Sequence, residues 1–186
     1  MSMKPSSLVA HMSAAWSYSR LSHAKRQKVG AVLIKHDNPI SCGCNGTYPG
    51  DDNCCEVDGV TKPDVIHAEV NCLDKLRFIH ETSIDAVLVC THEPCLGCAR
   101  EIWKSKVKHV VFEEFYKSEK SPSNWDGIEY LLKKGVLVEK YSERPDGKGG
   151  THFETFVIDH YWLTRARLGD VKEWPAGFGI ARSLVD

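Results

Sequence analysis

The alternation of apolar and polar residues along the chain predicts helices and strands in an order typical of an α/β protein. Over residues 6–20, apolar side chains recur every three or four positions, as they do on the buried face of a helix. Residues 29–34 are instead apolar at nearly every position, which is typical of a strand that is buried on both faces. A turn at 36–39 leads into a second strand over 40–44, so these two strands are expected to form a hairpin.

The middle of the chain alternates strand and helix. Helices are predicted over 65–78, 95–105 and 124–134, and strands over 84–90, 107–112 and 136–141. A strand, a helix and a second strand in this order form a right-handed unit with parallel strands. The predicted fold class is therefore α/β, with three layers (α/β/α) built around a five-stranded mixed sheet.

The pattern weakens after residue 141, which divides the chain into a domain and an extension. Residues 1–141 form the predicted domain, and residues 142–186 form a C-terminal extension. Charged residues and glycines interrupt the pattern over 142–150, and apolar residues at helical spacing predict one further helix over 151–167. This extension is expected to be helical and to pack either on the domain or at a subunit interface, and the sequence leaves both possibilities open.

The composition limits the classes of function. The chain has 186 residues, 42% hydrophobic and 26% charged, which is ordinary for one globular domain. Its net charge of −1 gives no overall positive field to attract nucleic acid. The chain has eight cysteines. Its first residues lack the pattern of a signal peptide, and no apolar run is long enough to cross a membrane. These features favour a cytoplasmic protein with reduced, metal-binding cysteines and no membrane partner.

Two short motifs carry the candidate chemistry: His-Ala-Glu at 67–69 and Pro-Cys-Leu-Gly-Cys at 94–98. A catalytic zinc takes three protein ligands and leaves its fourth position to a water molecule, whose pKa falls toward ~7. The three ligands are expected to be His67, Cys95 and Cys98. Glu69 then remains unliganded and is the candidate catalytic residue, because it is free to carry protons.

Each motif alone has a simpler interpretation. A Cys-x-x-Cys pair is often half of a structural zinc site or a redox pair, and an isolated His-x-Glu indicates very little. A structural zinc usually has four protein ligands, however, and needs no unliganded carboxylate such as Glu69. Both motifs together, with Pro94 directly before the first cysteine, match the H-x-E…P-C-x-x-C signature of zinc deaminases of nucleobases.

With both motifs placed on this order of elements, the chain resembles the cytidine deaminase superfamily, and within it the deoxycytidylate (dCMP) deaminases, including those of large DNA bacteriophages. The resemblance covers about residues 29–141, and it is carried by residues 29–31, 43–46, 53–55, 67–71, 94–99, 115–116 and 125–126. It implies hydrolytic deamination of dCMP to dUMP and ammonia, which would supply dUMP for thymidylate synthesis in the cytoplasm (the host cytoplasm, if a phage encodes the chain).

The resemblance also implies roles for further residues. Asn45 and Tyr116 are expected to contact the substrate, although the Asn-Gly pair at 45–46 is equally typical of a simple turn. The candidates for the 5′-phosphate are Arg26, Lys28 and Lys117. From charge alone, the basic segment 25–28 is more typical of a solvated loop than of a phosphate contact.

Regulation and assembly are likewise implied by the resemblance. The family forms homo-hexamers that dCTP activates and dTTP inhibits, with Mg²⁺ as a possible companion of such a triphosphate. The candidate residues for this effector are Asn45, Gly46 and Gly50. Some phage enzymes hold a second, structural zinc, whose ligands here would be His23, Cys54 and Cys55. The alternative is that these cysteines are free.

Two other functions are compatible with the same motifs. The Glu-Pro-Cys sequence at 93–95 resembles the tRNA adenosine branch, and five tryptophans offer rings on which bases stack. A deaminase of tRNA or single-stranded DNA is therefore the main alternative, although tryptophans more often belong to a core or an interface. A binding module with a structural zinc and no enzymatic activity is the second alternative.

Overall fold

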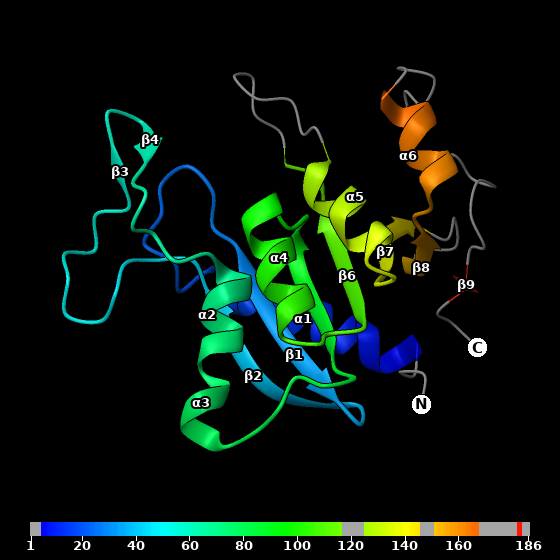
Figure 1. Cartoon of the computed structure of the whole chain (residues 1–186), viewed down its shortest axis with the longest axis horizontal. Helices are drawn as coiled ribbons and strands as arrows, with labels where there is room; N and C mark the ends of the chain where they lie inside the picture. The colour runs from blue at the N-terminus through cyan, green and yellow to red at the C-terminus, as the bar shows by residue number, and fades with distance from the viewer. Residues whose placement is uncertain (1–4, 117–124, 146–150, 168–181, 184–186) are drawn as a thin grey trace.

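The computed structural model describes residues 5–116, 125–145, 151–167 and 182–183. They form three layers, with a mixed sheet in the middle (Figure 1). One face of the sheet is covered by α1 (Pro5–Ser19), and the other by α2 (Ala68–Asp74), α4 (Leu96–Lys104) and α5 (Asp126–Lys133). The predicted fold class is confirmed.

The sheet is wider than predicted. In spatial order its strands are β2 (Asn38–Cys44), β1 (Gly30–Lys35), β5 (Val87–His92), β6 (His109–Glu114), β7 (Leu137–Pro145), β8 (Thr151–Val157) and β9 (Arg182–Ser183). The central strands β5, β6 and β7 run parallel, and all other neighbours are antiparallel. Among the described residues the main sheet thus has seven strands instead of five, because β8 and β9 extend it beyond β7.

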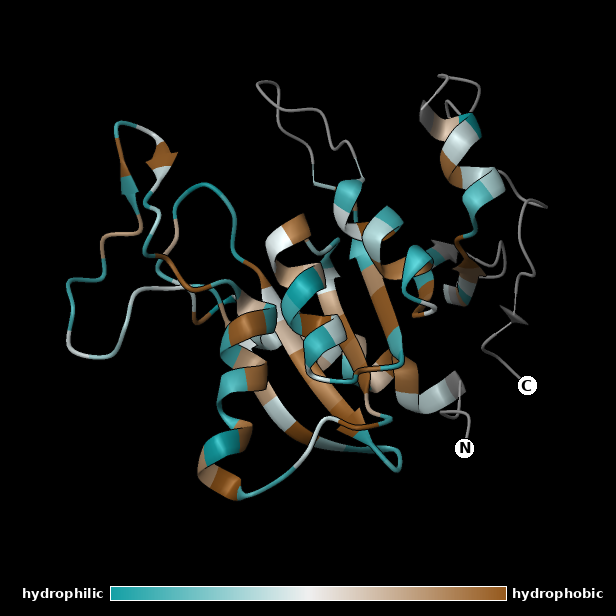
Figure 2. Ribbon diagram, viewed as in Figure 1, coloured by the Kyte–Doolittle hydropathy of each residue, from teal (hydrophilic) through white to brown (hydrophobic). Residues whose placement is uncertain are grey.

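The central strands are apolar on both faces because each face has its own core. Along β1, Ala31 and Leu33 pack in the core beneath α2 and α4, whereas Val32 and Ile34 pack against α1. Figure 2 shows the resulting hydrophobic colour along the middle strands and the hydrophilic residues on the outer sides of the helices. Two cores of this kind fix the strands from both sides, so the edge of the sheet is a rigid support for a site.

The helix predicted over 65–78 begins later and is divided in two. Ile66 is held in extended form, because its N–H donates to the Gly46 carbonyl (2.8 Å) and its carbonyl accepts from the Gly46 N–H (3.1 Å). The first helix therefore starts only after His67, and it ends at Asp74. The short helix α3 (Leu76–Ile79) follows and ends at His80, whose φ of 53° is left-handed.

Residues 51–64, where the sequence predicts neither helix nor strand, contain a small hairpin. Its strands are β3 (Glu56–Val57) and β4 (Val60–Thr61), which pair only with each other. Figure 1 shows this hairpin projecting away from the main sheet. It was missed because strands of two residues leave no hydrophobic period in the sequence.

The helix predicted over residues 151–167 is wrong in its first half. Residues 151–157 form β8, which pairs antiparallel with β7, and only His160–Arg167 form a helix, α6. The segment is rich in threonine and phenylalanine, which favour a pleated surface. The unpaired edge of β7 decided between strand and helix, since it offered a row of backbone partners that the sequence does not reveal.

The described part of the C-terminal extension packs on the domain. Ile158, Trp162 and Leu163 are 1%, 6% and 3% exposed and belong to the same core as the central strands. The N–H of Ile158 donates to the carbonyl of Val138 in β7 at 2.9 Å, which ties the end of β8 to the sheet. Among the described residues, no helix is long and apolar enough to span a lipid bilayer.

The contact between α1 and β1 leaves no space for a side chain at Gly30. A Cβ added there would lie 1.9 Å from the carbonyl oxygen of Ala15 and 2.7 Å from the backbone nitrogen of Ser19. We expect Gly30→Ala to lower the free energy of unfolding by about 1–3 kcal/mol, because α1 must shift off the sheet. Gly46→Ala is the control, since no atom lies within 4 Å of its added Cβ. Equal urea midpoints for the two variants would contradict this packing.

Candidate active site

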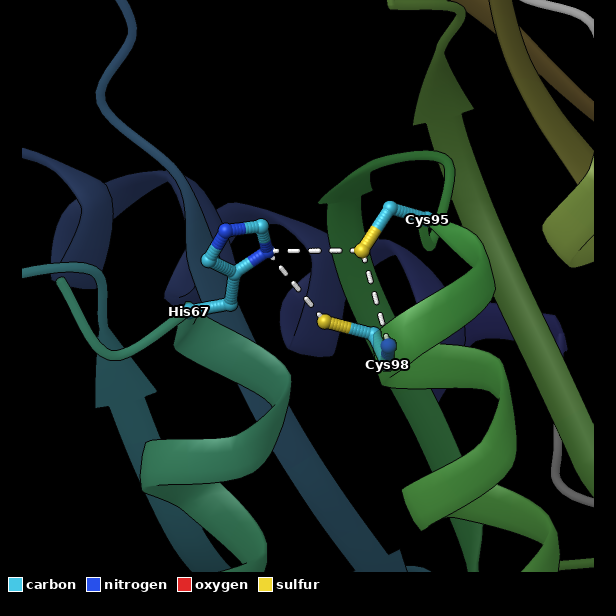
Figure 3. A group of neighbouring side chains, drawn as sticks. All are labelled: His67, Cys95 and Cys98. Carbon is cyan, nitrogen blue, oxygen red and sulfur yellow. Dashed lines mark hydrogen bonds between the residues drawn. The ribbon is translucent and has the colours of Figure 1, made fainter. Parts of the chain in front are cut away.

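Two helix N-termini converge on one point. His67 is the N-cap residue of α2 and Cys95 the N-cap residue of α4, and both have extended backbones with ψ of 153° and 169°. Cys98 follows in the first turn of α4. Figure 3 shows these three side chains pointing toward one another from the two helices. The structure thus brings together the three residues that the sequence selected as metal ligands.

The spacing of the three donor atoms suits a zinc ion. His67 Nδ1 lies 3.6 Å from Cys95 Sγ and 3.3 Å from Cys98 Sγ, and the three ligand atoms are all within 4.8 Å of one another. Tetrahedral zinc, with its usual bond lengths to nitrogen and sulfur, places these atoms about 3.6 Å apart. Among the described residues, this is the only group of three His, Cys, Asp or Glu donors so arranged.

One of the three donors already has the protonation state that a metal ligand needs. A hydrogen bond from Cys98 is the main cause that lowers the pKa of Cys95 to about 3, so Cys95 is a thiolate at neutral pH. The hydrogen bond with Cys95 raises the pKa of His67 to about 9, and the same neighbour together with burial raises the pKa of Cys98. A metal must therefore displace protons from His67 and Cys98, which makes its binding weaker at low pH.

Glu69 lies beside the cluster without belonging to it. It occupies the second residue of α2, on the helix face that also buries Ala68 and Cys72, and it is only 3% exposed. Burial raises the pKa of its carboxyl above the ordinary value, and the charge of His67 opposes this in part. Burial thus favours the protonated form of this carboxyl, which suits a group that must accept a proton and pass it on.

A cavity of about 440 Å³ opens next to the cluster. Of the predicted residues, its lining includes His67, Glu69, Cys95, Asn45, Arg26 and Tyr116. Lys28 is exposed and does not line it, and neither do Gly46 and Gly50. Lys117 lies outside the described residues. The structure therefore gathers His67, Cys95, Glu69 and three of the five predicted substrate contacts around one space.

Asn45 lines the cavity, but its side chain is occupied by the backbone. Its Oδ1 accepts from the N–H of Val29 and its Nδ2 donates to the carbonyl of Gln27, both at 2.9 Å. Asn45 therefore fixes the segment 27–29 that forms one wall.

Arg26 and Tyr116 meet at the cavity. The Arg26 guanidinium donates to Thr61 Oγ1 at 3.2 Å and to the Tyr116 hydroxyl at 3.5 Å. Glu56 accepts from the backbone N–H of Arg26 at 3.1 Å and so fixes the chain at this point. A cation beside two hydroxyl groups is suited to an anionic group such as a phosphate.

Several residues of the cavity were not predicted. Glu56 and Thr61 come from the β3–β4 hairpin. Glu93 is 9% exposed, and its Oε1 accepts from the N–H of Tyr116 at 2.9 Å, so it positions that residue. The Glu-Pro-Cys sequence resembles the tRNA adenosine branch of the deaminases. In this structure its glutamate holds the backbone of Tyr116.

His92 also lines the cavity and was not predicted. Burial lowers its pKa to about 4, so the ring is neutral at neutral pH. The Thr91 hydroxyl accepts from the N–H of Gly30 at 3.1 Å and lies 2.9 Å from His92 Nδ1. The hydroxyl and the ring are therefore hydrogen-bonded, and the tautomer of the ring sets which of them donates.

The residues considered for a second zinc do not come together. Cys54 Sγ donates to the carbonyl of Glu56 at 3.2 Å, and Cys55 is buried against Ala24 and Val65. His23 is exposed and joins no group of three donors within the described part of the chain. These cysteines serve local packing and turn structure.

Comparisons with known proteins agree with this site. The sequence profile of the family described as "Cytidine and deoxycytidylate deaminase zinc-binding region" matches residues 5–114. The crystal structure of dCMP deaminase from the cyanophage S-TIM5, in complex with dCMP and dUMP, is 40% identical with a TM-score of 0.69, covering 75% of this chain and 99% of that one.

Two curated relatives match shorter segments. Deoxycytidylate deaminase of Mycobacterium phage D29 is 31% identical over 113 residues, which are 53% of this chain and 87% of that protein. ComE operon protein 2 of Bacillus subtilis (strain 168) is 29% identical over 97 residues, 50% of this chain. The match spans only 51% of the length of that Bacillus protein.

Zinc content tests the assignment of the ligands. We expect the purified chain to hold about one zinc ion, and His67→Ala and Cys98→Ala to lose it, because two donors cannot retain the ion. Glu69→Gln should keep its zinc, since Glu69 is outside the donor group. Cys54→Ala is a second control. Metal analysis of the four variants after dialysis measures this, and a zinc-replete Cys98→Ala protein would contradict the cluster.

Proposed function

The chain belongs to the cytidine and deoxycytidylate deaminase family, and we propose from this that it is a zinc-dependent enzyme that hydrolyses dCMP to dUMP and ammonia. The observation that carries the proposal is the arrangement of the site. A buried, unliganded carboxylate, Glu69, lies beside a three-donor metal cluster at the wall of a cavity. The cyanophage enzyme bound to dCMP and dUMP, at 40% identity, supports the choice of substrate.

The metal and the carboxylate have separate roles in this reaction. When bound to His67, Cys95 and Cys98, zinc supplies Lewis acidity that makes a water molecule nucleophilic at neutral pH. Glu69 removes a proton from the attacking water, which adds to C4 of the cytosine ring, and passes this proton to N3. It then transfers the remaining hydroxyl proton to the amino group, so that the C4–N4 bond breaks and ammonia leaves. A raised pKa suits this exchange, because Glu69 alternates between its two protonation states.

The opposite part of the cavity is suited to the rest of the nucleotide. Arg26, with Thr61 and Tyr116 beside it, is the group we assign to the 5′-phosphate. The wall held by Asn45 faces the nucleoside. Neither Lys28, which is exposed and does not line the cavity, nor Lys117, which lies outside the described residues, is needed for this assignment.

The size of the cavity favours a free nucleotide over a polynucleotide. About 440 Å³ is in the range of pockets that enclose one small molecule. A deaminase of tRNA or single-stranded DNA would also need a basic surface that follows the strand, and the chain has a net charge of −1. We therefore prefer the mononucleotide.

Several finer expectations stay predictions. They are activation by dCTP, inhibition by dTTP, Mg²⁺ as the companion of a triphosphate effector, assembly into hexamers and a cytoplasmic location. Their support is the family resemblance alone. The backbone of Gly46, one of the candidate effector residues, pairs with that of Ile66.

The role of Glu69 can be tested by a single substitution. We expect Glu69→Gln to lower kcat for dCMP by about 10²–10⁴-fold, because the amide cannot carry the protons. Ammonia release would be measured with dCMP, dCTP, deoxycytidine and CMP, with and without added dCTP, and with a single-stranded oligonucleotide. Turnover of the oligonucleotide alone would favour the nucleic-acid alternative. A zinc-loaded wild-type chain that is inert toward every substrate would overturn the proposed function.

The phosphate contact predicts a difference between substrates. We expect Arg26→Ala to raise KM for dCMP by about tenfold or more, because a hydrogen bond to a charged group is lost. Turnover of deoxycytidine, which has no phosphate, should change less than twofold. Lys28→Ala is the matched control, since this exposed lysine does not line the cavity. An equal loss on both substrates would show that Arg26 supports the fold and not the phosphate.

A further inference from the structure

One wall of the cavity is connected to the C-terminal extension through three aromatic rings. Trp162 of α6 stacks on Phe115 with ring centroids 5.7 Å apart and an angle of 9° between the ring planes. It also contacts Trp125 edge-on, at 5.9 Å. Phe115 and Trp125 themselves meet at 6.3 Å. A single side chain of the extension thus contacts both of the other rings.

One of these rings lines the cavity, and the other belongs to the residue before a lining residue. Phe115 directly precedes Tyr116, whose side chain lines the cavity beside Arg26. Trp125 lines the cavity itself, together with Asp126 and Gly127 at the start of α5. A displacement of either ring would therefore change the shape of the space available to a nucleotide.

Trp125 needs support from its surroundings to stay in place. Its φ of 52° is left-handed, a conformation that is unfavourable for a residue with a bulky side chain. Its position at the N-terminus of α5 is fixed by the helix that follows, where the N–H of Glu129 donates to its carbonyl at 2.8 Å. Such a conformation persists only where packing determines it, and Trp162 supplies one of the packing surfaces.

The start of α5 in turn touches the loop that carries the first cysteine of the metal cluster. A Cβ added to Gly127 would lie 2.0 Å from the carbonyl oxygen of Pro94 and 2.8 Å from the carbonyl carbon of Cys95. The backbones of α5 and of this loop are therefore in direct contact. A displacement of Trp125 is therefore expected to move the backbone of this loop, and with it the side of the cavity that the loop forms.

Trp162 is held firmly enough to act as a support. The backbone N–H of Trp162 donates to Asp159 Oδ1 at 2.7 Å, at the start of α6. The neighbouring residues Ile158 and Leu163 are buried in the main core at 1% and 3% exposure. Trp162 itself is only 6% exposed.

We propose that Trp162 is a positioning residue of the substrate cavity, and that α6 is part of the site's architecture through its contacts with Trp125 and Phe115. This inference rests on the proposed function, because the ligand of the cavity is taken to be a pyrimidine deoxynucleotide. Trp162 itself does not line the cavity. It determines how the wall formed by Tyr116 and Trp125 faces a bound nucleotide.

The test compares substitutions at two adjacent buried residues of α6. Trp162→Leu keeps an apolar side chain but removes both ring contacts, and we expect KM for dCMP to rise about tenfold while kcat changes less than threefold. Trp162→Phe, which keeps a shorter ring, should give a rise of about threefold. Leu163→Ala is the matched control, because it removes core packing from the same helix and keeps all three rings.

Each variant would also be measured without turnover. Zinc content should stay at the wild-type value, and the affinity for the product dUMP, measured by calorimetry on the zinc-loaded protein, should fall by the same factor as KM rises. If Trp162→Leu cannot be isolated folded, the smaller effect of Trp162→Phe decides. The melting temperature of each variant separates a loss of affinity from a loss of stability.

The outcomes are distinct. If Trp162 and Leu163 variants lose stability alike while KM and dUMP affinity stay at wild-type values, Trp162 is ordinary core and this inference is overturned, with the proposed function intact. If the wild-type chain binds neither dCMP nor dUMP, the proposed function fails and the inference fails with it. Wild-type binding of dUMP without turnover would refute the activity alone, and the dUMP affinities would still decide the role of Trp162.

Discussion

The structure depends on one constraint: α2 and α4 must begin side by side at the same edge of the sheet. The donor residues His67 and Cys95 occupy the N-cap positions of these helices, where both have an extended backbone. The first helix cannot start earlier, because Ile66 is paired with Gly46. Two apolar cores hold the strands beneath the helices, so the donor atoms are placed before any metal arrives.

The same constraint explains the environment of Glu69. As the second residue of α2 it lies on the face that packs toward the sheet, and it is buried where a surface carboxylate would be exposed. Burial raises its pKa, while the thiolate and imidazole of the neighbouring cluster provide the metal ligands. One short helix start therefore separates the two tasks of the site, which are to hold an ion and to move protons.

The walls of the cavity come from segments that have little in common in the sequence. The β3–β4 hairpin contributes Glu56 and Thr61, and the segment 27–29 is held by Asn45. Trp125 reaches the cavity from the start of α5 and packs on Trp162 of the C-terminal extension. A common metal centre is thus combined with walls that other segments supply, and such segments are where members of one fold differ in substrate.

The sequence by itself determined the elements with strong periodicity and the chemistry carried by local motifs. The buried strands around Ala31 and Val110 could be located, and so could the three donor residues that the structure brings together, with Glu69 beside them, because their residue types and spacing are local properties. The tertiary structure decided what depends on distant partners. Residues 151–157 became a strand because β7 had a free edge, and Glu56, Glu93 and His92 joined the site because folding placed them there. No local pattern contains this information, since a cavity wall is defined by neighbours in space and not by neighbours in the chain.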